Sequence, residues 1–410
     1  MTSVTPRQVD LRPLKRLYTA AGAATATFLP FFVLYLAHRG VTPAAIGGTL
    51  AAASLLLVAL GPLWGHVADV RLGVPRALAV TLTASALLMA ALGLPWPQVL
   101  ALCLVGAVFG GVSGTSVVLE DSLTLAVLGP QDATAYGSVR QWTSLGWAVV
   151  VLVAGAVYQQ LSLSWMVPLA VTGLLAMLLT LRGLPTPPPP SGRAGRTGAD
   201  FAALLRSSPR LVGWLVALAV VAVSVQAATT FVPLAITDAG GGPFLVAVSA
   251  SVGALIEIPF FGRSQRIVER LGLRNTYLCG VGVQLLVLLS WAVARTPDQI
   301  AVTKMLTGVS FALSYAATVV VTSRLVPAHL RASGQGLLQV AAGLGPVLGA
   351  AAGGLVYQVF GARVLFLGAA GSLALGATIA GFALSGPRFA RRATAAGQDS
   401  SDVPVDGSKK

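Results

Sequence analysis

The sequence predicts an all-α integral membrane protein of about twelve transmembrane helices, arranged as two halves of six. Only 10% of the 410 residues are Asp, Glu, Lys or Arg, against about 25% in a soluble domain, and 55% are hydrophobic. The hydrophobic residues fall in runs of about 20, the length that crosses a hydrocarbon core roughly 30 Å thick. A Pro- and Gly-rich stretch divides these runs into two sets.

The hydrophobic runs give the expected helices in order. Short connections between several of them require consecutive helices to run antiparallel. Small residues at 20–26 have the composition of a signal-peptide cleavage site, but they open the first run instead of following it, so the segment is taken as the first helix. The predicted helices cover 17–37, 44–65, 77–95, 97–127, 139–159, 164–182, 211–235, 243–262, 276–294, 297–322, 333–357 and 363–385.

The domain organisation follows from where the runs stop. Residues 1–16 form a cytoplasmic N-terminal segment, 17–182 the first six-helix bundle, and 210–385 the second. Residues 183–209 are charged and rich in Pro and Gly, as expected of a cytoplasmic linker. Residues 386–410 are polar and low in aromatic residues, which predicts a disordered cytoplasmic tail.

The basic residues predict the orientation. With the N-terminus inside, 22 of the 27 Lys and Arg residues fall on the cytoplasmic side. Outside segments hold only Arg39, Arg295 and Arg363, while Arg140 and Lys304 lie within helices. We therefore expect a multi-pass protein of the cytoplasmic membrane with both termini inside. The net charge of +14 reflects this topology and does not indicate nucleic acid, because no basic face interleaved with aromatic residues exists.

Composition also argues against an enzyme. The two cysteines, Cys103 and Cys279, lie in apolar runs and suggest no disulfide or metal site. The three histidines fall at helix ends or in loops, without a nucleophile or metal-ligand cluster around them. No phosphate-binding Gly-rich Lys motif is present. We expect no cofactor and no metal.

Two predicted cytoplasmic turns, six helices apart, repeat one another. GHVADVRLGVPR (65–76) and RIVERLGLR (266–274) each combine an acid, Arg and Gly. Gly permits a tight turn, and the acid can meet a helix N-terminus and neighbouring Arg residues to hold an inward gate together. The alternative is that short inner loops collect Gly and Arg through the positive-inside bias. The proposed gating residues are Asp69, Arg71, Gly73, Arg76, Glu269, Arg270, Gly272 and Arg274.

These turns resemble the signature loop of the major facilitator superfamily, whose pattern is acid, Arg, any residue, Gly, any residue, Arg. ERLGLR at 269–274 fits the pattern, and DVRLGVPR at 69–76 carries one extra residue. The resemblance covers nearly the whole chain. It implies the major facilitator fold, transport of a small solute, and a monomer as the working form.

Ionisable residues within predicted helices are functional candidates, because burying them in a bilayer is costly. They are Glu120, Asp121, Arg140, Glu257 and Lys304. Asp121 and Arg140 lie on antiparallel helices at similar depth, which predicts an ion pair between them. Glu120 projects about 100° away from Asp121, so only one of the two is expected to face the cavity. We favour Asp121 because VVLEDSLTL (117–125) resembles the helix 4 segment that supplies a partner carboxylate in one branch of this superfamily.

The segment AYGSVRQWTSLGW (135–147) resembles the fifth helix of the branch that holds lactose permease and the nucleoside and phenylpropionate permeases. That resemblance implies that Arg140 binds solute hydroxyls and that Trp147 stacks on a ring, with Trp142 nearby and Asp121 as partner carboxylate. The alternatives are an Arg that reaches the inner surface and Trp residues in packing or in the interface belt.

The second half departs from that branch where its proton chemistry lies. KMLTGVS (304–310) has Thr307 and Ser310 where lactose permease carries a His and a Glu. Glu257 is then the best remaining proton carrier, unless it is a structural acid bonded near the cytoplasmic end. Lys304 either binds an anionic solute or extends outward. Gln226 and Tyr315 are candidate cavity-lining groups.

Three functions remain open. The first is proton-coupled symport of a sugar, nucleoside or aromatic acid by alternating access. The second is proton-coupled efflux of amphipathic compounds. The third is a membrane receptor on the same fold that transports nothing, which would have no need for Asp121.

Overall fold

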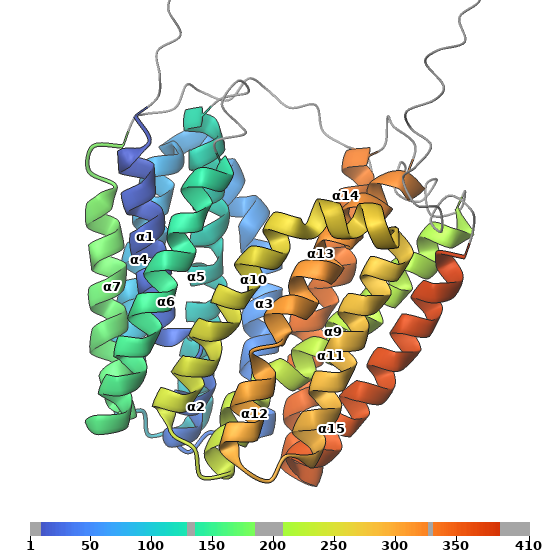
Figure 1. Cartoon of the computed structure of the whole chain (residues 1–410). Coiled ribbons are helices and arrows are strands. Elements are labelled where there is room, and N and C mark those ends of the chain that lie inside the picture. Colours follow the sequence, from blue (N-terminus) through green and yellow to red (C-terminus); the bar gives the residue numbers. More distant parts are fainter. Residues whose placement is uncertain (1–9, 129–135, 185–207, 327–330, 386–410) are drawn as a thin grey trace, which may run out of the picture.

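The computed structural model describes residues 10–128, 136–184, 208–326 and 331–385. Every regular element within these ranges is a helix. Most of the predicted linker 183–209 and all of the predicted tail 386–410 lie outside the described residues. The described chain begins and ends at the same end of the molecule, at the top of Figure 1.

The helices of the first half follow the predicted runs. Pro43 occupies the first turn of its helix, where a missing N–H costs nothing, and the side chain of Thr42 accepts a hydrogen bond from Ala45 N. The elements are α1 (Arg12–Phe28), α2 (Phe32–His38), α3 (Pro43–Val67), η1 (Ala68–Leu72), α4 (Val74–Leu92), α5 (Val99–Leu128), α6 (Tyr136–Gln160), η3 (Leu163–Trp165) and α7 (Met166–Thr180).

The second half repeats this plan. Its first helix also starts on a Pro, with the Ser208 side chain accepting a hydrogen bond from Leu211 N. The elements are α9 (Pro209–Asp238), α10 (Pro243–Leu271), α11 (Leu273–Val293), α12 (Pro297–Lys304), α13 (Thr307–Leu325), α14 (Arg331–Leu344), η5 (Gly345–Gly349) and α15 (Ala350–Ala383).

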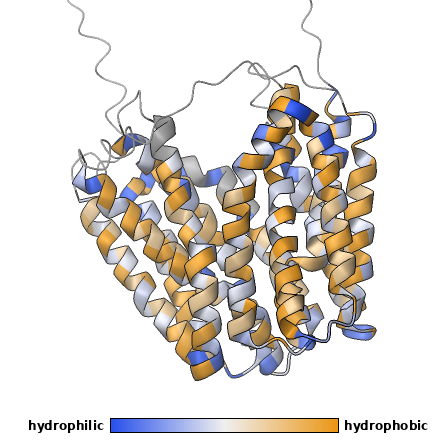
Figure 2. Ribbon diagram, turned by 180° about the vertical axis from the view of Figure 1, so that it is seen from behind, coloured by the Kyte–Doolittle hydropathy of each residue, from blue (hydrophilic) through white to orange (hydrophobic). Residues whose placement is uncertain are grey.

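Ten helical spans within the described residues are long and apolar enough to cross a membrane. One of them, Gly336–Ala383, bends at Gly361, where φ is 79° and ψ is 175°, and the chain returns from there to the top of Figure 1. The apolar part of α10, Pro243–Glu257, is shorter than the other spans. The predicted count of twelve requires dividing the long span at Gly361 and including α10. Figure 2 shows apolar residues along the helices and polar residues gathered at their ends.

Two runs predicted as single helices are broken. The run 17–37 is interrupted between α1 and α2 at residues 29–31, because Pro30 has no N–H to continue the helical ladder. The run 297–322 is interrupted after Lys304, where the N–H groups of Met305 and Leu306 bond three residues back instead of four. Hydrophobicity alone does not reveal such breaks, since both sides of each are apolar.

Gly residues with positive φ mark equivalent turns in the two halves. Gly73 precedes α4 with φ 75° and ψ 149°, and Gly272 precedes α11 with φ 77° and ψ 160°. At the opposite end, Gly40 and Gly240 have φ 81° and 90°. L-residues with a side chain rarely adopt these angles, so Gly is required there. The repeat seen in the two sequence motifs is thus also a repeat of backbone geometry.

The two halves touch along two seams of small residues. On one seam Gly47 of α3 lies against the backbone of Ala350 and Gly354 in α15. On the other, Gly155 of α6 lies against Ala247 of α10. The Oγ atom of Ser251 also donates to Ala148 O at 3.1 Å across this second seam. Absent or small side chains allow the helix axes to approach closely.

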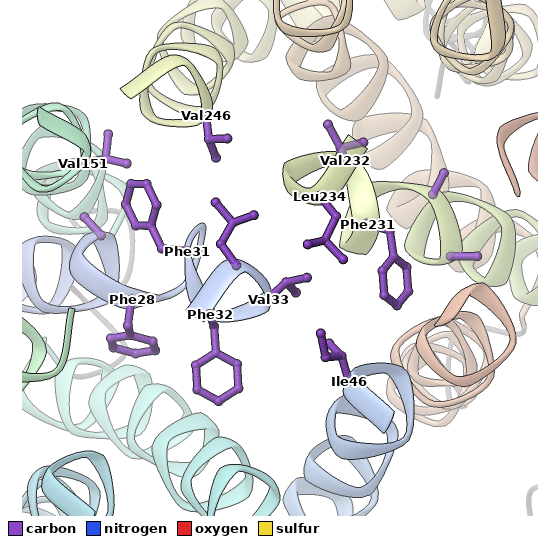
Figure 3. Close-up of a cluster of buried hydrophobic side chains, with 14 of the residues drawn as sticks. Phe28, Phe31, Phe32, Val33, Ile46, Val151, Phe231, Val232, Leu234 and Val246 are labelled. Carbon is purple, nitrogen blue, oxygen red and sulfur yellow. The ribbon is translucent and has the colours of Figure 1, made fainter. Parts of the chain in front are cut away.

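The contact between the halves is confined to one end. Buried residues of α3 fall between 46 and 53, and none lies in 54–67. A cluster of buried apolar side chains fills the closed end, where Figure 3 shows Phe31, Val33, Val246 and Leu234 from both halves gathered together. Toward the end that carries Gly73 and Gly272 the ribbons of the halves diverge (Figures 1 and 2). Among the described residues, the two halves are therefore packed together at one end and lie apart at the other.

Candidate functional site

A cavity of about 420 Å³ lies above the closed end and is formed mainly by the second half. This volume is in the range of roughly 300–1,000 Å³ that is usual for small-molecule sites. Helices α9, α10, α11, α13 and α15 contribute to its wall, and so does the last residue of α12, Lys304. Its polar lining consists of Thr229, Ser249, Glu257, Gln284, Lys304, Thr307, Ser310 and Ser314, and its aromatic lining of Trp147 and Phe311.

One acid and one base face this cavity. Glu257 comes from α10, at the end of the apolar part of that helix. Lys304 is the last residue of α12, and its Nζ donates to Ser249 Oγ at 3.1 Å. An ammonium at the C-terminus of a helix is favoured by the exposed carbonyl groups there. Both charged residues predicted in the second half therefore line one space.

The chain places these charges by bringing two helices into backbone contact. Gly308, in the first turn of α13, lies against the carbonyl oxygen of Gly253 in α10, and a Cβ at Gly308 would be 3.3 Å from Glu257 N. A side chain at Gly308 would push α10 and α13 apart. The broken helix is held at the wall of the cavity by this contact.

Gln284 of α11 carries an amide group with a hydrogen-bond donor that no described residue uses. It is only 4% exposed, it lines the cavity, and its Nε2 atom has no hydrogen-bond partner among the described residues. A buried amide without a partner costs free energy, so such groups mark places where something else binds. Gln284 was not among the site residues predicted from the sequence.

Trp147 is the one first-half residue among those that line the cavity. It is partly buried on α6, the helix that packs against α10 across the second seam. The predicted partners of Trp147 are not in this space. Arg140, Asp121 and Trp142 are absent from the described lining of the cavity.

The predicted ion pair between Asp121 and Arg140 is not formed. Instead, Oδ1 of Asp121 accepts hydrogen bonds from the hydroxyl groups of Tyr18 at 2.9 Å and Tyr136 at 2.8 Å. The exposed guanidinium of Arg140 lies 5.9 Å from the ring centroid of Tyr18, a cation–π distance. The predicted pair did not take account of α1, from which Tyr18 reaches the carboxylate.

Glu120 and Asp121 differ sharply in environment. Glu120 is 2% exposed, and its Oε1 atom has no partner among the described residues. Asp121 is partly exposed and doubly hydrogen-bonded. Asp121 is thus the more accessible of the two, although neither lines the cavity.

The remaining predicted site residues are scattered. Trp142 packs beside α1, with the ammonium of Lys15 5.7 Å from its ring. Gln226 donates to Thr230 Oγ1 at 2.9 Å within α9. Tyr315 is 52% exposed and stacks on Phe311 with ring centroids 5.3 Å apart, so it stands next to a cavity residue. None of these three belongs to the described cavity wall.

The two signature turns lie at the open end. Arg71, Arg76, Glu269 and Arg270 are exposed there, while the side chain of Asp69 lies outside the described part of the structure. Arg274 is partly buried, and its Nε atom has no partner among the described residues.

Sequence reasoning missed two kinds of residue. Tyr18 is one of several hydroxyl residues in the first predicted run, so nothing in the sequence distinguishes it from the others. Ser249 and Thr229 are small hydroxyl residues on apolar helices, where most such groups bond their own helix backbone, as Thr229 does to Val225 O. Only the fold shows which of them face a cavity.

Comparisons with known proteins agree on one class of protein, the membrane transporters. A family model described as the MFS_1 like family matches residues 11–368. The uncharacterized transporter YwbF of Bacillus subtilis (strain 168) is 23% identical over 324 residues, covering 78% of this chain and 79% of its own length. The maltose permease of Geobacillus stearothermophilus is 26% identical over 326 residues, covering 78% and 81%.

Solved structures of the same fold are also similar. The crystal structure of the nucleoside transporter NupG has a TM-score of 0.80 at 18% identity, covering 91% of this chain and 98% of its own. A bacterial homologue of the human lysosomal transporter Spinster, in an inward-facing and occupied conformation, has a TM-score of 0.70 at 14% identity, covering 91% and 96%. These likenesses establish the fold.

Proposed function

Because this chain belongs to the MFS_1-like family of membrane transporters, we propose that it carries a small organic solute across the cytoplasmic membrane by alternating access, in symport with protons. The observation that carries the proposal is the cavity that holds Gln284, Lys304 and Glu257 together. Its end toward the apolar cluster of Figure 3 is closed, and the halves diverge on the other side.

The lining favours a ring-bearing solute with hydrogen-bond acceptors. Gln284 Nε2 and Lys304 Nζ are donors, and carbonyl, hydroxyl or carboxylate oxygens would accept from them. Trp147 offers an aromatic face on the opposite wall. Sugars, nucleosides and aromatic acids meet these requirements. The names of the similar maltose permease and nucleoside transporter NupG fall in the first two classes.

We therefore propose that the solute binds mainly to the second half, and not to the first half as the sequence suggested. Arg140 and Asp121, proposed from the sequence, lie outside the described cavity wall. The tyrosine hydroxyls on Asp121 give that residue a structural role in this state. We assign Trp147 as the residue through which the first half contacts the solute.

Glu257 is the proposed proton carrier. It faces the cavity, and no ion pair joins it to Lys304 within the described residues. A carboxyl group in such a place can gain a proton from the open side and lose it when the cavity faces the other way. Glu120 is buried away from the cavity, so it would exchange protons more slowly.

The turns at Gly73 and Gly272 are proposed as the inward gate, with the open end and both termini in the cytoplasm. Their exposed Arg and Glu side chains would meet when the halves close at that end. The closed-end cluster would then separate.

Uptake into proteoliposomes tests the proposal. The purified protein is reconstituted with a trapped pH dye, and maltose, uridine, phenylpropionate or a lipophilic cation is added outside. We expect the interior of the liposomes to become acidic when a ring solute is added. This acidification should be lost in Lys304→Gln and Glu257→Gln but kept in Asp298→Asn. Proton movement with the lipophilic cation alone would show efflux instead, and no flux with any solute would contradict transport of these classes.

A further inference from the structure

A second hollow, unrelated to the transport cavity, lies between α1 and α6 near the open end. Its volume is about 580 Å³. Its upper part is basic and aromatic, and its lower part is formed by small side chains of α1. The basic and aromatic lining consists of Arg12, Lys15, Arg16 and Trp142, and the small lining of Thr19, Ala20 and Ala23.

The hollow faces away from the interior of the bundle. Tyr18 is fully buried and points to Asp121 on α5. Arg16 projects from α1 about 160° away from Tyr18, because successive helical residues are rotated about 100°, and it is exposed. The side chains of the hollow therefore stand on the outer surface of α1, which is the surface that lipid covers in a membrane.

The hollow is positively charged and lacks an acid. None of its lining residues is Asp or Glu. Asp10, the nearest acid along the described chain, uses Oδ1 to accept from the backbone N–H of Arg12 at 3.0 Å. The ammonium of Lys15 lies 5.7 Å from the ring centroid of Trp142. Three cations thus stand together at the start of α1, where the free N–H groups of the helix add to the positive potential.

The partly buried indole of Trp142, which lines the hollow, has an unused hydrogen-bond donor within the described structure. Its Nε1 atom is buried and has no hydrogen-bond partner among the described residues. An indole N–H is a donor only, so the missing partner must be an acceptor. A phosphate oxygen lying among the basic side chains would satisfy it.

We propose that this hollow binds the headgroup of an anionic phospholipid from the adjacent leaflet. The phosphate would be held by Arg12, Arg16 and Lys15, and would accept the hydrogen bond from Trp142. The small residues Thr19, Ala20 and Ala23 leave a channel along α1 that an acyl chain fills. This apolar continuation favours a lipid over a free phosphate ion.

Quenching of tryptophan fluorescence by brominated lipids tests the proposal. The full chain is reconstituted in phosphatidylcholine with increasing brominated phosphatidylglycerol, or with brominated phosphatidylcholine. The signal of Trp142 is the difference between the wild type and Trp142→Phe, which the seven tryptophans of the chain make necessary. We expect that signal to be quenched at lower fractions of phosphatidylglycerol than of phosphatidylcholine.

Charge removal provides the decisive variant. Arg12→Gln with Arg16→Gln should weaken the preference for phosphatidylglycerol about fivefold per charge removed. Arg210→Gln with Arg324→Gln removes the same charge from exposed sites of the second half and should leave the preference unchanged. Raising the salt concentration on the wild type should reduce the preference too, and this needs no variant.

Three results would overturn the proposal. One is equal quenching of Trp142 by the two brominated lipids. Another is an equal loss of preference in both double variants, which would indicate a general charge effect. The third is full displacement of phosphatidylglycerol by inorganic phosphate at the same phosphate concentration, which would assign the hollow to a free anion.

Discussion

Lys304 donates from Nζ to Ser249 Oγ across 3.1 Å and so ties the break between α12 and α13 to α10. A hydrogen bond to a charged group contributes about 1.5–3 kcal/mol, so losing the position of the ammonium should weaken solute binding. We expect Lys304→Gln to lower uptake at low solute concentration by at least about tenfold, and Ser249→Ala to lower it less.

Arg295→Gln is the matched control for Lys304, since it removes an exposed charge just before α12. Initial rates of uptake into proteoliposomes give the comparison. Equal rates for Lys304→Gln and the control would remove Lys304 from the solute site.

Glu257→Gln should abolish the proton-driven accumulation of solute but leave the exchange of solute across the membrane intact. Gln keeps the shape of the side chain in the cavity but cannot carry a proton. We expect solute counterflow to persist while uptake driven by a pH gradient falls to background. Asp298→Asn, an exposed acid in the first turn of α12, should retain both activities. Accumulation by Glu257→Gln would mean that another group carries the proton.

Gly308→Val should destabilise the protein and reduce transport. The added side chain meets the carbonyl oxygen of Gly253, and overpacking of this kind costs about 1–3 kcal/mol. Gly282→Val is the control, because a Cβ at Gly282 on α11 meets nothing within 4 Å. Thermal unfolding of the detergent-solubilised variants would be compared, and equal midpoints would show that α10 and α13 adjust freely.

The losses of stability caused by Tyr18→Phe and Tyr136→Phe should be more than additive when the two substitutions are combined. Each hydroxyl bonds the same oxygen of Asp121, so either one alone still satisfies that oxygen. Removing both leaves the carboxylate short of donors, and we expect an extra loss of about 1 kcal/mol in the double variant. Introducing Asp121→Asn should relieve that extra loss. Chemical unfolding would measure it, and strict additivity would argue against the shared acceptor.

Gly73→Ala and Gly272→Ala should each destabilise the fold by about 1–3 kcal/mol, because positive φ combined with ψ near 150–160° is essentially restricted to Gly. Gly65→Ala is the control on the preceding helix, where a Cβ meets nothing and φ is ordinary. Similar losses of stability in the two variants would agree with the equivalent backbone geometry of the two turns. No loss at either would mean that the turns relax to other angles.

The sequence predicts the fold well because hydrophobic runs and Gly turns are local signals. The run 276–294 became α11 (Leu273–Val293), and the two signature turns have nearly the same φ and ψ. Breaks such as Pro30 and Met305 change direction without changing hydrophobicity, so the runs conceal them.

The site is harder to predict because it depends on rotation of each helix about its axis. Glu257, Lys304 and Trp147 line one cavity, whereas the sequence left open a structural role for Glu257, an outward-extending Lys304 and a packing role for Trp147. Asp121 was assigned to Arg140 by similar depth and by the family resemblance, yet Tyr18 and Tyr136 are the residues that donate to it. Two residues at equal depth are neighbours only when their helices also face one another, and no local pattern fixes that angle.

The small-residue seams determine how the halves can move. Where Gly47 meets Ala350 and where Gly155 meets Ala247, backbone and methyl-sized surfaces touch without interlocking side chains. Such smooth surfaces can roll over one another without any side chain leaving its rotamer. The free-energy barrier to reorienting the halves would then lie in the contacts at the two ends, which are the apolar cluster at the closed end and the two signature turns at the other.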